Sequence, residues 1–108
     1  MFLLVTKKII PKGFRGIAIF PFVLVKYPLD KENLVFVNHE RIHLRQQLEL
    51  LLLPFFIWYC AEFLVRLIQY KNTDLAYRNI SFEREAYAKE KDLGYLKLRS
   101  FWMFLKYI

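Results

Sequence analysis

The sequence has little cysteine, glycine and proline. Of its 108 residues, one is cysteine, three are glycine and four are proline. The single thiol, Cys60, excludes an intrachain disulfide, which fits a reducing, cytoplasmic compartment. Because Cys60 lies in an apolar run, we expect a small core residue rather than a nucleophile. The chain shows no internal repeat, linker or low-complexity segment, and its length predicts a single domain over residues 1–108.

Clustered charge is also missing. The formal net charge is +7, but the Lys and Arg residues are scattered and no run of five occurs. Without a zinc finger, a ribonucleoprotein motif or a recognisable recognition helix, we expect a solvated basic surface and no nucleic-acid binding. Hydrophobic residues make up 56% of the chain and aromatic residues 19%, which excludes disorder and predicts an aromatic-rich core.

Long apolar segments are absent from the sequence. The first ten residues do not resemble a signal peptide, because their apolar residues precede the lysines. The longest uncharged run, Leu50–Ala61, has twelve residues and contains Pro54, whereas a membrane-spanning helix needs about twenty. We therefore expect a helix buried in the core. Leu50–Trp58 is apolar enough that a peripheral contact with a membrane surface stays open.

The first third of the chain predicts strands. Residues 2–10 and 14–26 are rich in β-branched and aromatic residues and are separated by the turn signal Pro11-Lys12-Gly13. Two or three strands are expected there, with Gly16 and Pro21 as breaks or bulges.

The remaining residues predict helices. We expect a helix over residues 31–53 with Asp30 as its cap, and a second helix, apolar nearly all round, that ends near residue 70. Pro54 either kinks the first helix or opens the second. A polar connection over residues 71–79 leads to a third helix, 81–93, which Gly94 would stop. Residues 95–108 form a short helix or a docked tail. The fold class is α+β: a small N-terminal sheet or hairpin followed by three or four helices.

The two histidines of the chain carry the clearest chemical signal. His39 and His43 stand four residues apart, so on a helix they share one face. That geometry presents two imidazole nitrogens to one tetrahedral zinc ion. Glu40 follows the first histidine, completing an HExxH pattern in which the glutamate takes a proton from water activated by the metal.

A catalytic zinc site needs a third protein ligand. Glu49, six residues after His43, would lie about 9 Å further along a continuous helix, beyond the reach of the same ion. Glu83 and Glu85 lie downstream in the segment Ser81–Tyr87, and they point about 200° apart on a helix, so only one can face the metal. We choose Glu83, because Ala86 shares its helical stripe and lets two helices approach closely.

HExxH followed by a helix bearing the residues Glu83-Arg84-Glu85-Ala86 resembles the gluzincin group of zinc metallopeptidases, and the chain length resembles the minigluzincins. The resemblance covers mainly residues 30–90. It implies a zincin-like fold, zinc (Zn2+) as cofactor, His39, His43 and Glu83 as metal ligands, and Glu40 as catalytic base.

The sequence departs from the gluzincin pattern at two places. Arg41 stands where an uncharged residue is usual, and Tyr87 replaces an aspartate that often orients a ligand histidine. Tyr87 could orient that histidine through its hydroxyl, or the contact is absent. Gln46 is either a partner of a ligand histidine or a solvated side chain.

These residues favour a zinc-dependent metallopeptidase acting on a peptide or protein substrate. Tyr77, Tyr87 and Arg78 are candidate donors to the oxyanion, and an edge strand from residues 14–26 could pair with an extended peptide. The alternative is a catalytically weak or latent metal-binding or interaction protein on the same scaffold, whose cleft the aromatic tail fills. A third hypothesis is a membrane-associated helical protein in which the HExxH residues are incidental.

Overall fold

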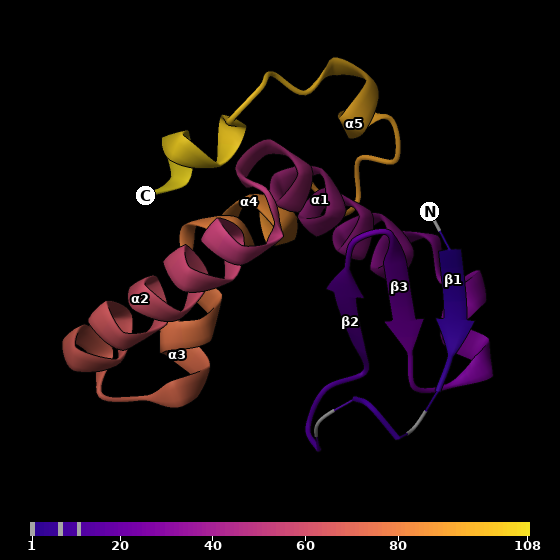
Figure 1. The fold of residues 1–108 in the computed structure, drawn as a ribbon, viewed down its shortest axis with the longest axis horizontal. Helices are drawn as coiled ribbons and strands as arrows, with labels where there is room; N and C mark the ends of the chain where they lie inside the picture. The colour runs from indigo at the N-terminus through magenta and orange to yellow at the C-terminus, as the bar shows by residue number, and fades with distance from the viewer. Residues whose placement is uncertain (1, 7, 11) are drawn as a thin grey trace.

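The computed structural model describes residues 2–6, 8–10 and 12–108. Within them a small sheet is followed by helices, which confirms the α+β class (Figure 1). Lys7 and Pro11, which we expected in a strand and in a turn, lie outside the described residues.

Three short strands form one mixed sheet: β1 (Phe2–Val5), β2 (Gly16–Ile19) and β3 (Phe22–Val25). The strand order is β1-β3-β2, with β1 parallel and β2 antiparallel to β3. Among the described residues of the predicted stretch 2–10, only Phe2–Val5 form a strand. Gly16 opens β2, and Pro21 lies in the turn between β2 and β3. The sheet therefore has β2 as one of its edges.

The first long helix starts later than predicted. A short 3-10 helix, η1 (Pro28–Glu32), precedes α1 (Leu34–Leu50). Asn33 caps α1, because its side chain accepts a hydrogen bond from the Phe36 N–H at 3.1 Å. The prediction of Asp30 as the cap is wrong: its carboxylate pairs with Arg15 at 2.5 Å.

A break at Leu51, whose φ is 65°, separates α1 from α2 (Leu52–Tyr70). Pro54 thus lies in the first turn of α2, so it opens the second helix. The prediction of a core helix is wrong, because Phe55 is its only buried residue and Cys60 is exposed. By length and composition α2 could cross a membrane. Of the 18-residue apolar stretch of α2 that meets this criterion, 6% is buried inside the protein.

The segment expected to be a polar connection contains a helix, α3 (Thr73–Arg78), capped by the Asn72 side chain. The next helix, α4 (Ser81–Lys89), ends four residues earlier than predicted, and Gly94 instead precedes α5 (Tyr95–Leu98). The chain finishes in a 3-10 helix, η2 (Met103–Tyr107), whose Phe104 is fully buried. The predicted docking of the tail is confirmed.

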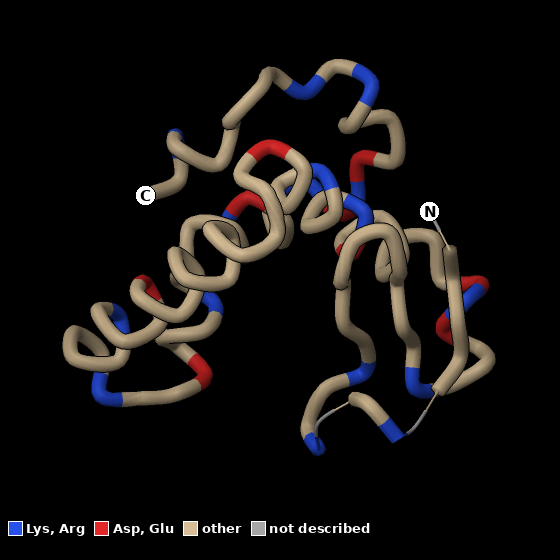
Figure 2. The backbone as a smooth tube through the Cα atoms, viewed as in Figure 1, with Lys and Arg blue, Asp and Glu red and all other residues tan. Residues whose placement is uncertain are grey.

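Helix α1 lies between the sheet and α4 (Figure 1). On the sheet side Leu44 packs against Ala18, Val23 and Val25. On the other side Ile42 packs with Ala86 of α4 and Tyr95. A third, aromatic cluster joins α2, α4 and η2 through the residues Phe55, Ile80, Phe82 and Phe104. This packing fixes α1 and α4 against each other. The Lys and Arg residues are spread over the chain rather than clustered, as the sequence indicated (Figure 2).

Candidate metal site and cleft

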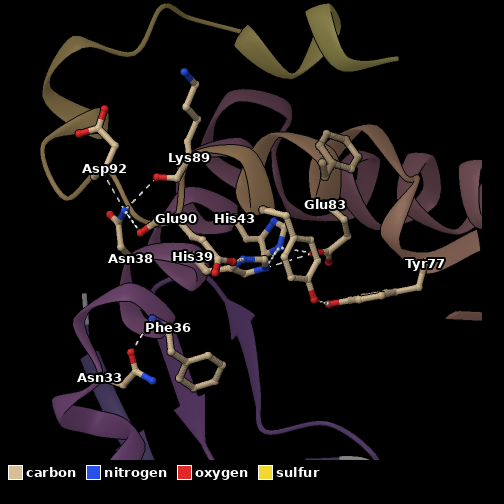
Figure 3. Close-up of polar contacts among 12 residues, drawn as sticks. Asn33, Phe36, Asn38, His39, His43, Tyr77, Glu83, Lys89, Glu90 and Asp92 are labelled. Carbon is tan, nitrogen blue, oxygen red and sulfur yellow. Dashed lines mark hydrogen bonds and ion pairs between the residues drawn. The ribbon is translucent and has the colours of Figure 1, made fainter. Parts of the chain in front are cut away.

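Two imidazoles and one carboxylate converge between α1 and α4 (Figure 3). His39 and His43 come from successive turns of α1, and Glu83 comes from the first turn of α4. All three are buried, with exposed fractions of 5%, 6% and 3%. Glu83 Oε1 lies 3.1 Å from Nε2 of each histidine, and the two Nε2 atoms lie 3.2 Å apart.

The three converging atoms match the face of a zinc tetrahedron. With metal–ligand distances of about 2.0–2.1 Å, neighbouring ligands of a tetrahedral zinc lie about 3.3–3.4 Å apart. The distances of 3.1–3.2 Å are close to that spacing. A neutral imidazole presents its Nε2 lone pair when Nδ1 carries the proton. The residues therefore fit a zinc ion bound by two nitrogens and one oxygen, with a fourth position open.

Each histidine has an acceptor for its second ring nitrogen. Nδ1 of His39 lies 2.8 Å from Glu90 Oε1, and Nδ1 of His43 lies 2.8 Å from Gln46 Oε1. An acceptor at Nδ1 holds the proton there and turns Nε2 toward a metal. The neighbours of both imidazoles thus hold the rings in the orientation that a metal ligand needs.

The acceptors are themselves held in place. Asn38, next to His39, donates to the backbone carbonyls of Lys89, Glu90 and Asp92, which anchors the chain at Glu90 beyond the end of α4. The Lys89 and Asp92 carbonyls also accept from the backbone N–H groups of Asp92 and Tyr95, so the turn that follows α4 is held by both side-chain and backbone bonds.

Behind His43 a buried polar chain continues to the C-terminal segment. Gln46 Nε2 donates to Glu85 Oε1 at 2.9 Å and to the Phe82 carbonyl. The fully buried Glu85 accepts from Tyr95 and from Arg99. Arg99 also pairs with Glu49 at 2.5 Å. Glu85 and Glu49, which we rejected as ligands, are therefore structural partners that point away from Glu83.

Electrostatics at the site without metal favour a protonated His43 beside an ionised Glu83. Burial alone would lower the pKa of His43, but the charge and hydrogen bond of Glu83 outweigh burial and raise this pKa to about 9. Burial acts to raise the pKa of Glu83, yet His43 and His39 hold it well below its usual range. The second Glu83 oxygen accepts from the Tyr59 hydroxyl at 2.7 Å.

Glu40, the residue after His39, lies on the wall of a cleft beside the site. With His39 it lines this cleft, which has a volume of about 1020 Å³ and lies between the sheet side and the α2–α3 pair. Its carboxylate makes no hydrogen bond or ion pair with any residue of 2–6, 8–10 and 12–108. Burial raises the pKa of Glu40, although the neighbouring His43 and His39 oppose that effect. A carboxylate of raised pKa beside a metal position is suited to proton transfer.

Three further predicted residues line the same cleft: Tyr77, Arg78 and Tyr87. The Tyr87 hydroxyl lies 3.4 Å from that of Tyr77 and does not bond to a histidine, so of the two alternatives for this residue the structure bears out the absent contact. Instead its ring packs edge-on against His39, with centroids 4.5 Å apart. The Arg78 guanidinium lies over the same ring.

Sequence reasoning missed Glu90 as the partner of His39 and Tyr59 as the partner of Glu83. Glu90 had a local signal, because it follows Glu83 by seven residues and so lies on the same helical face. Tyr59 had none, because it reaches the site only through the packing of α2 against α4.

The chain matches no protein-family model, no curated protein and no solved structure at a significant level. Its function is therefore inferred from its own residues.

Proposed function

We propose that this chain is a zinc-dependent metallopeptidase on a minimal, gluzincin-type zincin scaffold. One observation carries the proposal: Nε2 of His39, Nε2 of His43 and Oε1 of Glu83 converge within 3.2 Å of one another, while both Nδ1 atoms face acceptors. A buried polar cluster that served only stability would not need two imidazole lone pairs aimed at one point.

The donor set favours zinc over other common ions. Imidazole nitrogen suits zinc, copper, iron and nickel, whereas magnesium and calcium prefer sites made of oxygen alone. Two nitrogens and one carboxylate oxygen with a fourth position open are the ligand set of catalytic zinc. When bound, zinc supplies Lewis acidity that polarises a carbonyl and makes water a better nucleophile at neutral pH.

Glu40 is the proposed general base. Its carboxylate accepts a proton from the water that attacks the scissile carbonyl and then delivers this proton to the leaving amine nitrogen. Two features support the role: its place beside His39 on the wall of the cleft, and its freedom from hydrogen bonds to the described residues. The raised pKa of this carboxylate makes it a stronger base than an exposed glutamate.

Tyr77 is the proposed donor to the oxyanion. Burial and the nearby charge of Glu83 raise the pKa of this phenol, so it keeps its proton at neutral pH. Its oxygen can accept from Tyr87, which leaves its own proton free for the substrate. Tyr59 is less suited, because its proton is already donated to Glu83.

The edge of β2 is suited to hold an extended peptide. The Arg15 carbonyl accepts from the Lys26 N–H, so Arg15 bonds toward β3. Because successive residues of an antiparallel strand direct their N–H and C=O groups to opposite sides, those of Gly16 face the free edge. Further along this edge, the Gln47 side chain donates to the Ala18 carbonyl and accepts from the Phe20 N–H, both at 2.7 Å, so these groups are not free for a peptide. Gly16 lines the cleft, so a substrate strand paired there would pass in front of the metal position.

Metal content and peptide cleavage test the proposal together. Protein stripped of metal and then supplied with zinc is expected to hold one zinc ion per chain and to cleave members of a quenched fluorescent peptide library. Glu40→Gln should keep the zinc and lose about 10²–10⁴-fold in kcat, because the base is removed but the ligands stay. The matched control is Glu32→Gln, an exposed glutamate of η1, which should change neither property.

The alternative is a metal-binding protein without hydrolytic activity. Zinc binding by wild type and Glu40→Gln alike, with no cleavage of any library member, would favour it. The aromatic tail gives this alternative no support as a plug, because none of residues 95–108 is among the described residues that line the cleft. Absence of zinc binding by the wild type would contradict both candidates.

A further inference from the structure

The outward face of α2 is an unbroken apolar stripe. Four of its residues fall within about 60° of one another at 100° per residue, and Val65 borders them. These five are largely exposed: Leu53 71%, Ile57 62%, Leu64 58%, Val65 54% and Ile68 77%. The stripe runs about 22 Å along the helix, and no charged residue lies within it. Such a long exposed apolar surface is uncommon on a protein that has no partner there.

The opposite face of α2 is already occupied. Phe55 packs against Phe82 with ring centroids 4.5 Å apart. The Glu62 carboxylate accepts from the Ser81 N–H and from the Trp58 ring. The contacts of Phe55 with Phe82 and of Glu62 with Ser81 join α2 to α4 and fix the rotation of the helix, so the apolar stripe faces outward.

The kind of partner follows from shape and charge. A helix that is apolar on one side and bound to its own protein on the other lies along a membrane surface rather than across it. The chain carries a net charge of +7, so two copies repel each other, whereas an anionic lipid surface attracts the chain. Lys71, which directly follows α2, places a basic group at one end of the stripe.

We propose that the stripe of Leu53, Ile57, Leu64, Val65 and Ile68 docks this chain onto an anionic phospholipid bilayer, with α2 in the plane of the interface. Leu64 also lines the cleft, and so does Cys60 beside it. The wall of the cleft therefore continues into the docking surface. This inference rests on the proposed peptidase function. Because the cleft adjoins the docking surface, the substrate class is polypeptide segments held at or emerging from the membrane surface.

Vesicle flotation tests the docking without using zinc or cleavage. The full chain is mixed with vesicles of phosphatidylcholine and phosphatidylglycerol, and separately with vesicles of phosphatidylcholine alone. Wild type is expected to float with the mixed vesicles, and the double variant Ile57→Glu, Ile68→Glu to lose about tenfold or more of its binding. The control is Leu29→Glu, which lies on η1 and is 80% exposed, and it should bind like wild type. Circular dichroism checks that each variant is folded.

Three outcomes would overturn the docking surface. Wild type fails to bind the mixed vesicles, or the control loses as much binding as the double variant. In the third, wild type is a dimer in sedimentation experiments without lipid, the double variant is a monomer, and neither binds vesicles; a second copy would then be the occupant. Glu40→Gln should bind vesicles like wild type, so failure of the docking and failure of the peptidase proposal give different results.

Discussion

At the scale of single residues, the site is defined by where protons reside. The Nδ1 atoms of His39 and His43 face a carboxylate and an amide oxygen, and their Nε2 atoms face Glu83. A metal and a proton compete for the same nitrogen, so binding of zinc requires neutral imidazole at Nε2. In the metal-free protein Glu83 instead stabilises the charged form of His43.

This competition predicts that zinc binding releases about one proton from His43 at neutral pH, because its pKa of about 9 keeps it charged until the metal arrives. Isothermal titration calorimetry in buffers of different ionisation enthalpy measures the number. Release should fall to about half a proton at pH 9 and approach zero as the pH rises further. A heat of binding that is independent of the buffer at pH 7.5 would contradict the protonated state of His43.

The same residue affects the stability of the metal-free protein. Its folded pKa of about 9 lies above the unfolded value of 6.5, so the unfolded chain loses this proton first as pH rises. The contribution of His43 to the free energy of unfolding is therefore complete below about pH 6.5 and is lost by about pH 9. Urea unfolding between these values should show decreasing stability without zinc and a weaker pH dependence with zinc bound.

Tyr77 offers a second test at this scale. Tyr77→Phe removes the proposed oxyanion donor and should lower kcat about 10²–10³-fold while zinc content stays unchanged. Tyr70→Phe, at an exposed position of α2, is the matched control and should leave kcat unaltered. Equal losses for the two variants, or no loss for Tyr77→Phe, would remove Tyr77 from the mechanism.

At the scale of elements, the helix period explains what could be predicted. His39 and His43 meet because both lie on α1, and Glu83 faces them because it and Ala86 share the stripe that packs on α1. The start of α1 could not be derived, since Asp30 and Asn33 are both good caps and only the contact with Arg15 decides between them. The exposure of α2 was likewise hidden, because an apolar sequence does not indicate what covers it.

Gln46 connects two elements, and this connection should influence the metal. It links His43 on α1 to Glu85 on α4, so Gln46→Met removes the acceptor that orients the imidazole. We expect zinc affinity to fall about 10–100-fold, measured by competition with a chromogenic chelator. Gln69→Met on α2 serves as control, because Gln69 contacts only Arg66 among the hydrogen bonds of the described residues. Unchanged affinity in Gln46→Met would show that packing alone orients His43.

At the scale of the whole molecule, zinc would join parts of the chain that are distant in sequence. Glu83 lies 44 residues from His39 and 40 from His43, so a shared ion would cross-link α1 to α4 across the centre of the fold. The ordered site requires this packing, and the unfolded chain lacks it. Binding free energy therefore becomes folding free energy.

Thermal unfolding should report this linkage. Free zinc at about 100 times its Kd should stabilise the protein by about 2.7 kcal/mol, which for a domain of this size raises Tm by about 10–20 °C. His43→Ala should lose most of the shift, and magnesium should not replace zinc, because it disfavours imidazole nitrogen. If zinc raised the Tm of His43→Ala as much as that of wild type, the ion would be bound elsewhere. The convergence of the three side chains would then be a feature of packing alone.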